Sequence, residues 1–238
     1  MSTIGRAHRA SGVADPTASD DVKLALKEMG RNATARQKQA RGLTWAEIEL
    51  FLSVSPRNLR DIRDRALVVV AYDRMCRREE LVSLRVEDIA EAGHGSGSIL
   101  IRRSKTDTTG EGATAYLSPL TMRLLVHWIK ESQIRQGAVF VRVLGPSEVA
   151  ESLTPQVVAT VLQKGEKWIG LNKVEWEKIS GHSARVGAAQ DLLALNMDLP
   201  SVMQAGRWTD TRMPMRYGEK VLAGRGAMAR TAKAQGRA

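Results

Sequence analysis

The sequence contains a single cysteine, Cys76, among 238 residues, and aromatic residues make up only 4% of it. One cysteine excludes an intrachain disulfide and a zinc site built from cysteines. The longest uninterrupted apolar run, Ala66–Tyr72, is far shorter than the about 20 residues that a membrane-spanning helix needs. The N-terminus has basic residues but no apolar run behind them, unlike a secretory signal. We therefore expect a soluble, cytoplasmic protein with no membrane partner.

Acidic residues are too few to balance the basic ones. The 36 Lys and Arg against 26 Asp and Glu give a formal net charge of +10 and a pI near 10.1. Residues 1–41 and 218–238 each carry a net charge of +4, whereas residues 42–217 carry only +2. Such basic ends are either solvated helix faces or arms that grip DNA phosphates. The excess favours a polyanionic partner, either nucleic acid or an anionic membrane surface.

Hydrophobic residues make up 43% of the chain, which is typical of a globular protein. The patterns predict a mainly α fold with one small antiparallel β-sheet (α+β) after an irregular lead-in of 17 residues. Thr44 and Glu47 form a capping box for a helix through Leu52, and Asn58 caps a long helix. Further predicted elements are helices over 19–40, 58–74, 81–84, 119–136, 154–168, 183–195, 199–206 and 211–218, a short helix in the tail, and strands over 98–101 and 113–117.

The stretch Ser180–Arg185, with the sequence SGHSAR, has a histidine and an arginine three residues apart at the predicted start of a helix. His182 and Arg185 then share one face with the free N–H groups of the first turn. A cation, a proton-transfer group and helix donors together fit a phosphate. On spacing alone, however, a polar surface patch is the simpler interpretation.

Other residues able to carry chemistry are spread along the chain. Arg77 and Glu80 follow the long apolar helix, and Lys105 lies in the turn between the two predicted strands, where a flexible ammonium group can reach a site. Trp208 follows a short predicted helix. Among the three tyrosines, Tyr217 is the one in a polar, late segment.

Taken in order, these residues resemble the pattern of the tyrosine recombinases, or phage-type integrases. That pattern is an arginine with a glutamate three residues later, a hairpin lysine, H-x-x-R, a histidine or tryptophan, and a tyrosine. The matching residues are Arg77, Glu80, Lys105, His182, Arg185, Trp208 and Tyr217. The runs SGHSARVGAA and MQAGRWT, over residues 180–189 and 203–209, add to the match. The resemblance covers Thr44 to Arg230 and implies the tyrosine recombinase catalytic-domain fold.

The resemblance implies a site-specific DNA recombinase or integrase that cuts and rejoins double-stranded DNA through a 3′-phosphotyrosyl intermediate. It implies no cofactor and no metal, because arginines neutralise the phosphate charge and the phosphotyrosine conserves the bond energy. The implied roles are the nucleophile for Tyr217, phosphate binding for Arg77, Arg185 and Trp208, general base or phosphate positioning for His182, general acid for Lys105, and orientation of the site for Glu80.

The resemblance also divides the chain and implies how it assembles. Members of the family carry an N-terminal core-binding domain that closes around DNA. We interpret residues 1–41 as the linker and last-helix remnant of such a domain, 42–221 as the catalytic domain and 222–238 as a basic C-terminal tail or helix. A homo-oligomer, a tetramer, is expected on DNA. Arg207 departs from the pattern, since a small residue is typical before the tryptophan, and adds a cation beside the site.

Three functions remain open at this point. The first is an active recombinase or integrase, and the second is a nicking and closing enzyme that resembles type IB topoisomerases. The third is a DNA-binding remnant that has lost recombination. The full set of catalytic residues favours an enzyme, whereas the short N-terminal region favours the remnant.

Overall fold

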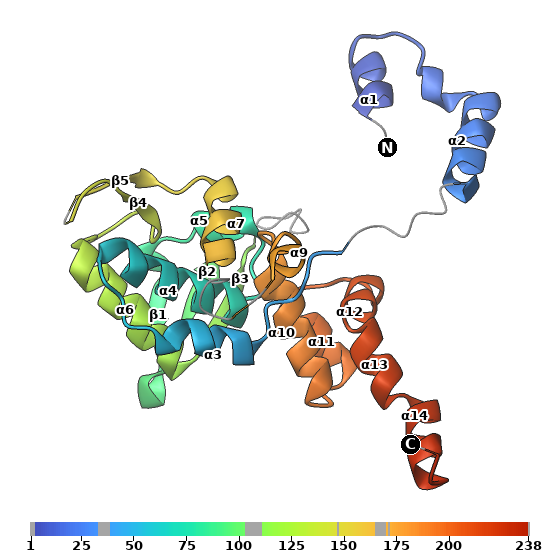
Figure 1. Cartoon of the computed structure of the whole chain (residues 1–238). Helices are drawn as coiled ribbons and strands as arrows, with labels where there is room; N and C mark the ends of the chain where they lie inside the picture. The colour runs from blue at the N-terminus through green and yellow to red at the C-terminus, as the bar shows by residue number, and fades with distance from the viewer. Residues whose placement is uncertain are drawn as a thin grey trace. The chain divides into compact units, whose positions relative to one another are not determined.

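The computed structural model describes residues 3–32, 39–102, 111–146, 148–164, 170 and 172–237. The chain forms two compact units, Met1–Lys38 and Gln39–Ala238 (Figure 1). The second unit begins at Gln39.

The first unit contains α1 (Thr3–Ala10), a short 3-10 helix (Pro16–Ala18) and α2 (Asp20–Asn32). The expected irregular lead-in is wrong, because residues 3–10 are helical. The carboxylate of Asp15 pairs with Arg9 of α1 and accepts the backbone N–H of Thr17 at 2.9 Å. These polar contacts stabilise a segment that has few apolar residues.

The helix expected over residues 19–40 is shorter than predicted. Its described part ends at Asn32, and residues 39–44 carry no helix. The backbone N–H of Arg41 donates instead to the carbonyl of Lys178 at 3.0 Å. A backbone bond to a residue so distant in the sequence cannot be read from local helix propensity.

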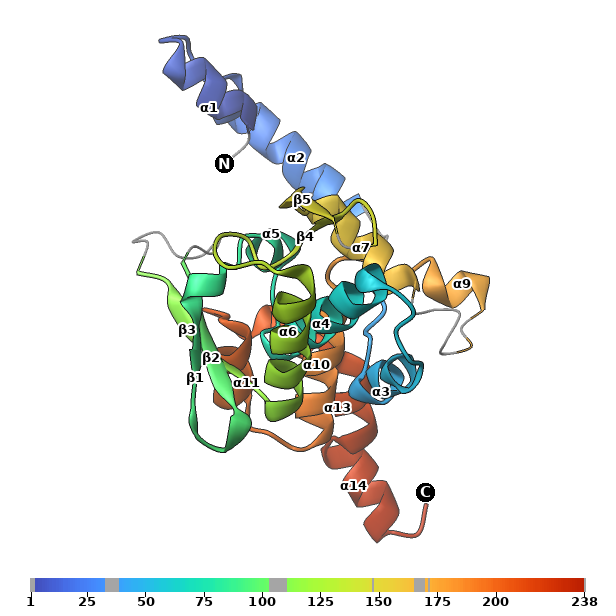
Figure 2. The ribbon, with the colours of Figure 1, turned by 90° about the vertical axis from the view of Figure 1, so that its left-hand side faces the viewer.

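The second unit is mainly helical with two small antiparallel sheets, which confirms the expected fold class. In Figure 2 the three-stranded sheet stands at one side of the helices. The helices are α3 (Trp45–Ser53), α4 (Leu59–Asp73), α5 (Arg78–Val82), α6 (Pro119–Ser132), α7 (Pro155–Lys164), α9 (Lys173–Trp176), α10 (Ser183–Ala194), α11 (Leu199–Gly206), α12 (Arg212–Tyr217), α13 (Glu219–Arg225) and α14 (Ala227–Ala234), and the strands are β1 (Ile89–Glu91), β2 (Gly97–Ile101), β3 (Ala113–Leu117), β4 (Val141–Val143) and β5 (Val149–Ser152).

Helix α4 is the centre of the core. The run Ala66–Ala71 is buried, and α4 packs against α3, α5, α6, α7 and α10. Each fully buried valine or leucine contributes about 1.5–3 kcal/mol to the stability of the fold, so α4 fixes the position of its neighbours.

Both predicted helix caps are confirmed. Asn58 accepts the N–H of Asp61 at 2.9 Å, and Glu47 accepts the N–H of Thr44 at 2.9 Å.

The larger sheet has the strand order β1–β2–β3, and its β2–β3 pairing confirms the predicted hairpin. In this sheet, Ile99 of β2 pairs with Ala115 of β3 on one side and with Ile89 of β1 on the other.

The expectation of a single sheet is wrong, because β4 and β5 form a second one. Strands of three or four residues carry too little alternation to be recognised in a sequence.

Helix ends differ from the expectations by a few residues. The helix predicted over 119–136 ends at Ser132, since Gln133 adopts a φ of 57° in the left-handed region. Where the sequence predicts a single helix in the tail, the structure has two, α13 and α14.

None of the described helices is both long and apolar enough to cross a membrane.

Candidate active site

Four segments that are distant in the sequence meet at the start of α10. Two of them are turns, Arg74–Arg77 after α4 and Gly206–Trp208 after α11. The other two are the start of α10 itself and the end of α12. The meeting segments carry Arg77, His182, Arg185, Trp208 and Tyr217.

Arg185 joins these segments. Its side chain is buried, and its Nη1 and Nη2 atoms donate to the carbonyls of Met75 and Gly206, each at 2.5 Å. The guanidinium lies 4.4 Å from the centre of the Trp208 ring, a cation–π arrangement. Burial, followed by the nearby Arg77 and Arg207, lowers the pKa of Arg185 to about 10, so the side chain stays cationic at neutral pH.

Glu80 connects two further arginines. Its Oε1 accepts Nη1 of Arg77 at 2.7 Å, and its Oε2 accepts Nη2 of Arg207 at 2.6 Å. Oε2 also accepts the backbone N–H of Arg77 at 3.1 Å, where α5 begins. Burial raises the pKa of Glu80, but Arg207 and then Arg77 lower it, and the net pKa lies below the usual value. The buried carboxylate is therefore ionised and orients Arg77.

Tyr217 ends α12 beside Trp208. The two ring centres are 5.8 Å apart with an interplanar angle of 70°, and Gln190 donates to the carbonyl of Tyr217 at 3.1 Å. Burial raises the pKa of the Tyr217 phenol, although Arg185 and other arginines oppose the shift. The hydroxyl is therefore protonated at neutral pH and needs a base before it can act as a nucleophile.

His182 is the residue before α10 and is half-buried. Burial, and then the charge of Arg185, lowers the pKa of the imidazole below its usual value. At neutral pH the ring is therefore uncharged, and one of its nitrogens can accept a proton.

Lys105 lies outside the described residues. The pairing of β2 with β3 ends at Ile101 and Ala113, so Lys105 belongs to the segment between these strands.

Within the described ranges, no group of three His, Cys, Asp or Glu residues has the arrangement of a metal site.

One arginine near the site, Arg74, was not recognised from the sequence, and the contacts of a second, Arg207, were not expected. Arg74 is buried at the end of α4, and its carbonyl accepts Nη1 of Arg207 at 2.9 Å. Arg207 was expected only as an additional cation beside the site, but it binds Glu80. The sequence signal that could have identified Arg74 is its place as a basic residue next to a long apolar run.

Several other sequence interpretations concern neighbouring residues. Arg78 and Glu79 form the expected exposed charge pair, at 2.7 Å. Tyr72 packs against Trp45 with ring centres 5.4 Å apart, and its hydroxyl donates to Asp191 at 2.6 Å. Tyr72 therefore has a structural role, as its position in an apolar run indicated.

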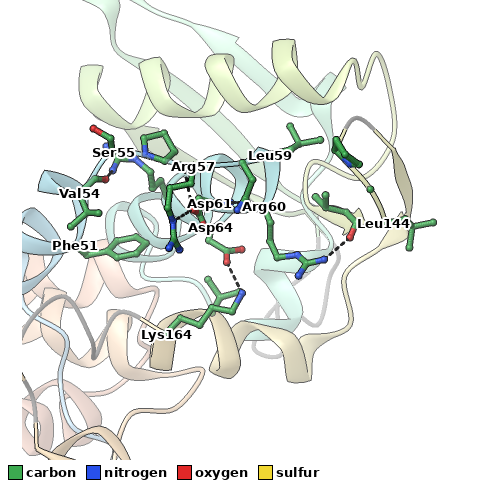
Figure 3. Close-up of a pocket in the computed structure, with 17 residues that line it drawn as sticks. Phe51, Val54, Ser55, Arg57, Leu59, Arg60, Asp61, Asp64, Leu144 and Lys164 are labelled. Atoms are coloured by element: carbon green, nitrogen blue, oxygen red, sulfur yellow. Dashed lines mark hydrogen bonds and ion pairs between the residues drawn. The ribbon is translucent and has the colours of Figure 1, made fainter.

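A pocket of about 620 Å³ lies elsewhere, between the end of α3, the start of α4, α7 and the end of β4 (Figure 3). Its polar lining includes Asp64, whose carboxylate accepts Nζ of Lys164 at 3.1 Å. None of the candidate site residues lines this pocket. It is therefore separate from the cluster around Arg185.

Comparisons with known proteins agree with one another. The family model described as "Phage integrase family" matches residues 41–221. The recombinase Cre of Escherichia phage P1 is 30% identical over 249 residues, which cover 97% of this chain and 72% of Cre. An integrase/recombinase XerD homolog of Selenomonas ruminantium is 25% identical over 231 residues, which cover 92% of this chain and 67% of the homolog.

Among solved structures, the XerH site-specific recombinase bound to a palindromic difH substrate in a post-cleavage complex has the same fold. The TM-score is 0.63 at 19% sequence identity, and the match covers 84% of this chain. The chain spans 56% of the length of that XerH chain.

Proposed function

Because this chain belongs to the phage integrase family, we propose that it cuts and rejoins double-stranded DNA through a covalent bond to Tyr217, as a site-specific recombinase or integrase. The observation that carries the proposal is the bridging position of Arg185. Its guanidinium connects the Arg77 turn with the Trp208 turn and lies next to Tyr217. A phosphate held there would meet two guanidiniums and a tyrosine hydroxyl.

The proposed reaction starts with attack of the Tyr217 oxygen on the scissile phosphodiester. His182 accepts the phenolic proton as the tyrosine–phosphorus bond forms, and the bond from phosphorus to the 5′ oxygen breaks. Lys105 donates a proton to the leaving 5′ oxygen. The reverse sequence of steps rejoins the strand.

The charge that develops on the phosphate oxygens determines which other residues are needed. Arg77 and Arg185 donate to the non-bridging oxygens, where two guanidiniums stabilise the transition state. The indole N–H of Trp208 adds a neutral donor. The reaction requires no metal ion, because the arginines supply the positive charge, and no nucleotide, because the phosphotyrosine bond conserves the energy for religation.

Burial of the site adds a conformational step to the proposal. Arg185 is 2% exposed and Tyr217 is 8% exposed, whereas 17% of the Arg77 side chain is exposed. A phosphate therefore reaches Arg77 first, and Trp208 or α12 must move before Tyr217 can attack. DNA binding supplies the free energy for this opening.

The wider proposal concerns domains, assembly and location. We assign residues 42–221 to catalysis, 222–238 to a basic tail, and 1–41 to the linker and last helix of a core-binding domain. We also propose that the chain works as a homo-oligomer, a tetramer, on double-stranded DNA in the cytoplasm. The resemblance to the family and the basic ends of the sequence support these assignments.

Covalent capture tests the proposed chemistry without a known target. The protein is incubated with a pool of randomised duplexes, each nicked near its centre, in the presence of a chelator. Protein-linked DNA is then recovered after denaturation and sequenced. We expect an adduct that Tyr217→Phe abolishes, since the variant keeps the ring but loses the nucleophilic oxygen. The exposed Tyr116 provides the matched control, and Tyr116→Phe should retain the adduct.

The outcomes separate the competing functions. An adduct that persists in Tyr217→Phe contradicts the assignment of the nucleophile. DNA binding without any adduct identifies a DNA-binding remnant instead of an enzyme. Adducts at many unrelated sequences, together with relaxation of supercoiled plasmid, identify a nicking and closing enzyme.

A further inference from the structure

Arg207 adopts a backbone conformation that arginine rarely takes. It follows α11 with φ 53° and ψ 48°, in the left-handed region that glycine occupies without steric cost. The structure therefore contains an arginine at a position where the backbone favours glycine. The contacts of its side chain give the reason.

The Arg207 guanidinium bridges two segments. Nη1 donates to the carbonyl of Arg74 at 2.9 Å, and Nη2 donates to Oε2 of Glu80 at 2.6 Å. Arg185 bridges the same two turns, but its hydrogen bonds to them go to the backbone carbonyls of Met75 and Gly206. Among the bonds of the described residues, Arg207 thus connects the turn of Trp208 to the carboxylate that holds Arg77.

Glu80 divides its two oxygens between two guanidiniums. Oε1 accepts from Arg77 and Oε2 from Arg207, so one negative charge faces two positive charges. The charge of Glu80 also acts to raise the pKa of the buried Cys76 thiol and of Arg185, so both groups lie near it. With one oxygen on Arg77 and the other on Arg207, the Glu80 carboxylate has a fixed orientation. The Arg77 guanidinium is therefore held in a fixed direction.

We infer that Arg207 is a positioning residue of this site: it holds Glu80 so that the Arg77 guanidinium is fixed where the scissile phosphate binds. The inference rests on the proposed function, since it assigns Arg207 to that same site. Arg207 is not a catalytic residue, because it acts on the phosphate only through Glu80 and Arg77.

The test compares wild type with Arg207→Gly, Arg207→Lys and Arg78→Gln. Glycine suits the left-handed backbone, so Arg207→Gly removes the guanidinium without adding backbone strain. Lysine keeps the charge but has a single ammonium group in place of the fork that bridges Arg74 and Glu80. Arg78→Gln removes the same charge from an exposed neighbour that pairs with Glu79.

The first readout is the pKa of the Glu80 carboxyl, followed by carbon NMR of labelled protein without DNA. We expect Arg207→Gly to raise this pKa, because Arg207 is the strongest influence that lowers it. Arg207→Lys should restore the lower pKa, and Arg78→Gln should leave it unchanged. An unchanged Glu80 pKa in Arg207→Gly overturns the inference, even if the variant melts at a lower temperature.

The second readout is the rate of adduct formation on a nicked duplex recovered by covalent capture, measured at saturating protein. Arg207→Gly should slow the reaction by about tenfold, with the DNA dissociation constant within about threefold of wild type. Arg207→Lys should recover only part of the rate. An unchanged rate in Arg207→Gly contradicts the inference. Absence of any wild-type adduct contradicts the proposed function instead, and the Glu80 titration then decides the inference by itself.

Discussion

The guanidinium of Arg185 lies against the face of Trp208, 4.4 Å from the ring centre, and is almost fully buried. A cation in that position is protected from water and held in place by two backbone carbonyls. Arg185, Trp208 and Tyr217 are therefore packed together in a closed arrangement. Under the proposed function, the reaction requires Trp208 to move so that a phosphate can reach Arg185.

A substitution at Gly206 tests how tightly Trp208 is packed against Arg185. A Cβ atom at Gly206 would lie 2.0 Å from Cζ3 of Trp208, so Gly206→Ala must push the ring away from Arg185. We expect the free energy of unfolding to fall by about 1–3 kcal/mol, which urea denaturation measures. Near-ultraviolet circular dichroism should show the displaced indole.

Gly224, near the end of α13, provides the control. An added Cβ atom there has no neighbour within 4 Å among the described residues. Gly224→Ala should leave stability unchanged or raise it by up to about 1 kcal/mol, since alanine favours a helix. Equal stability of Gly206→Ala and wild type would show that Trp208 is loosely held.

Glu80→Gln should destabilise the protein and remove part of its pH dependence. Burial raises the pKa of Glu80, but Arg207 and Arg77 lower it to below the usual value. The carboxylate therefore contributes stability that is fully present above its unfolded pKa of about 4.3 and is lost as pH falls through the lower folded pKa. We expect a loss of about 3–5 kcal/mol at neutral pH, because Arg77 and Arg207 lose their shared counterion.

Urea denaturation at a series of pH values from neutral to acidic measures this effect. The difference between wild type and Glu80→Gln should shrink as the pH falls below about 4. Glu79→Gln is the matched control, since its exposed carboxylate pairs only with Arg78 among the ion pairs of the described residues, and it should change stability by less than about 0.5 kcal/mol. A constant difference at every pH would contradict the ion-pair role of Glu80.

His182 should set the acid limit of adduct formation. Burial and Arg185 lower its pKa, so the imidazole stays neutral below the usual value of about 6.5. The rate should therefore remain constant through neutral pH and fall only as the pH drops through the lowered pKa of His182. Single-turnover adduct formation across this range measures the limit.

His182→Gln should lower the rate by about 10²–10⁴ and flatten this part of the profile. The exposed His127, on α6, provides the control, and His127→Gln should keep both the rate and the profile. If His182→Gln retains the wild-type profile, another group is the base.

The basic C-terminal tail should contribute to DNA affinity in a salt-dependent way. Residues 218–238 carry a net charge of +4, and helix α14 includes Arg230 and Lys233. Fluorescence anisotropy with a labelled duplex should show weak, largely nonspecific binding and a steep loss of affinity with salt. Replacing both residues by glutamine should reduce the slope of log affinity against log salt by up to about 2, at about 0.9 per phosphate contact. An unchanged slope would show that Arg230 and Lys233 do not contact the DNA.

The sequence by itself determined the local features of this protein. The caps at Thr44 and Asn58 were predictable because a capping side chain binds backbone groups only three residues away. The core helix α4 and the β2–β3 hairpin followed from hydrophobic patterning. The family followed from the order and spacing of residues such as Arg77, His182 and Tyr217, and its catalytic-domain fold came with it.

Tertiary structure alone decided the rest, because those features depend on atoms that are distant in the sequence. Residues 39 and 40 are not helical as expected, and the next residue, Arg41, bonds to Lys178 instead. The pairing of β4 with β5 is decided by packing, since strands so short carry almost no pattern. The sequence indicated Arg207 only as an additional cation beside the site, and the fold pairs it with Glu80. A buried carboxylate and a guanidinium 2.6 Å apart form an ion pair only where desolvation and geometry coincide, and no local spacing encodes that.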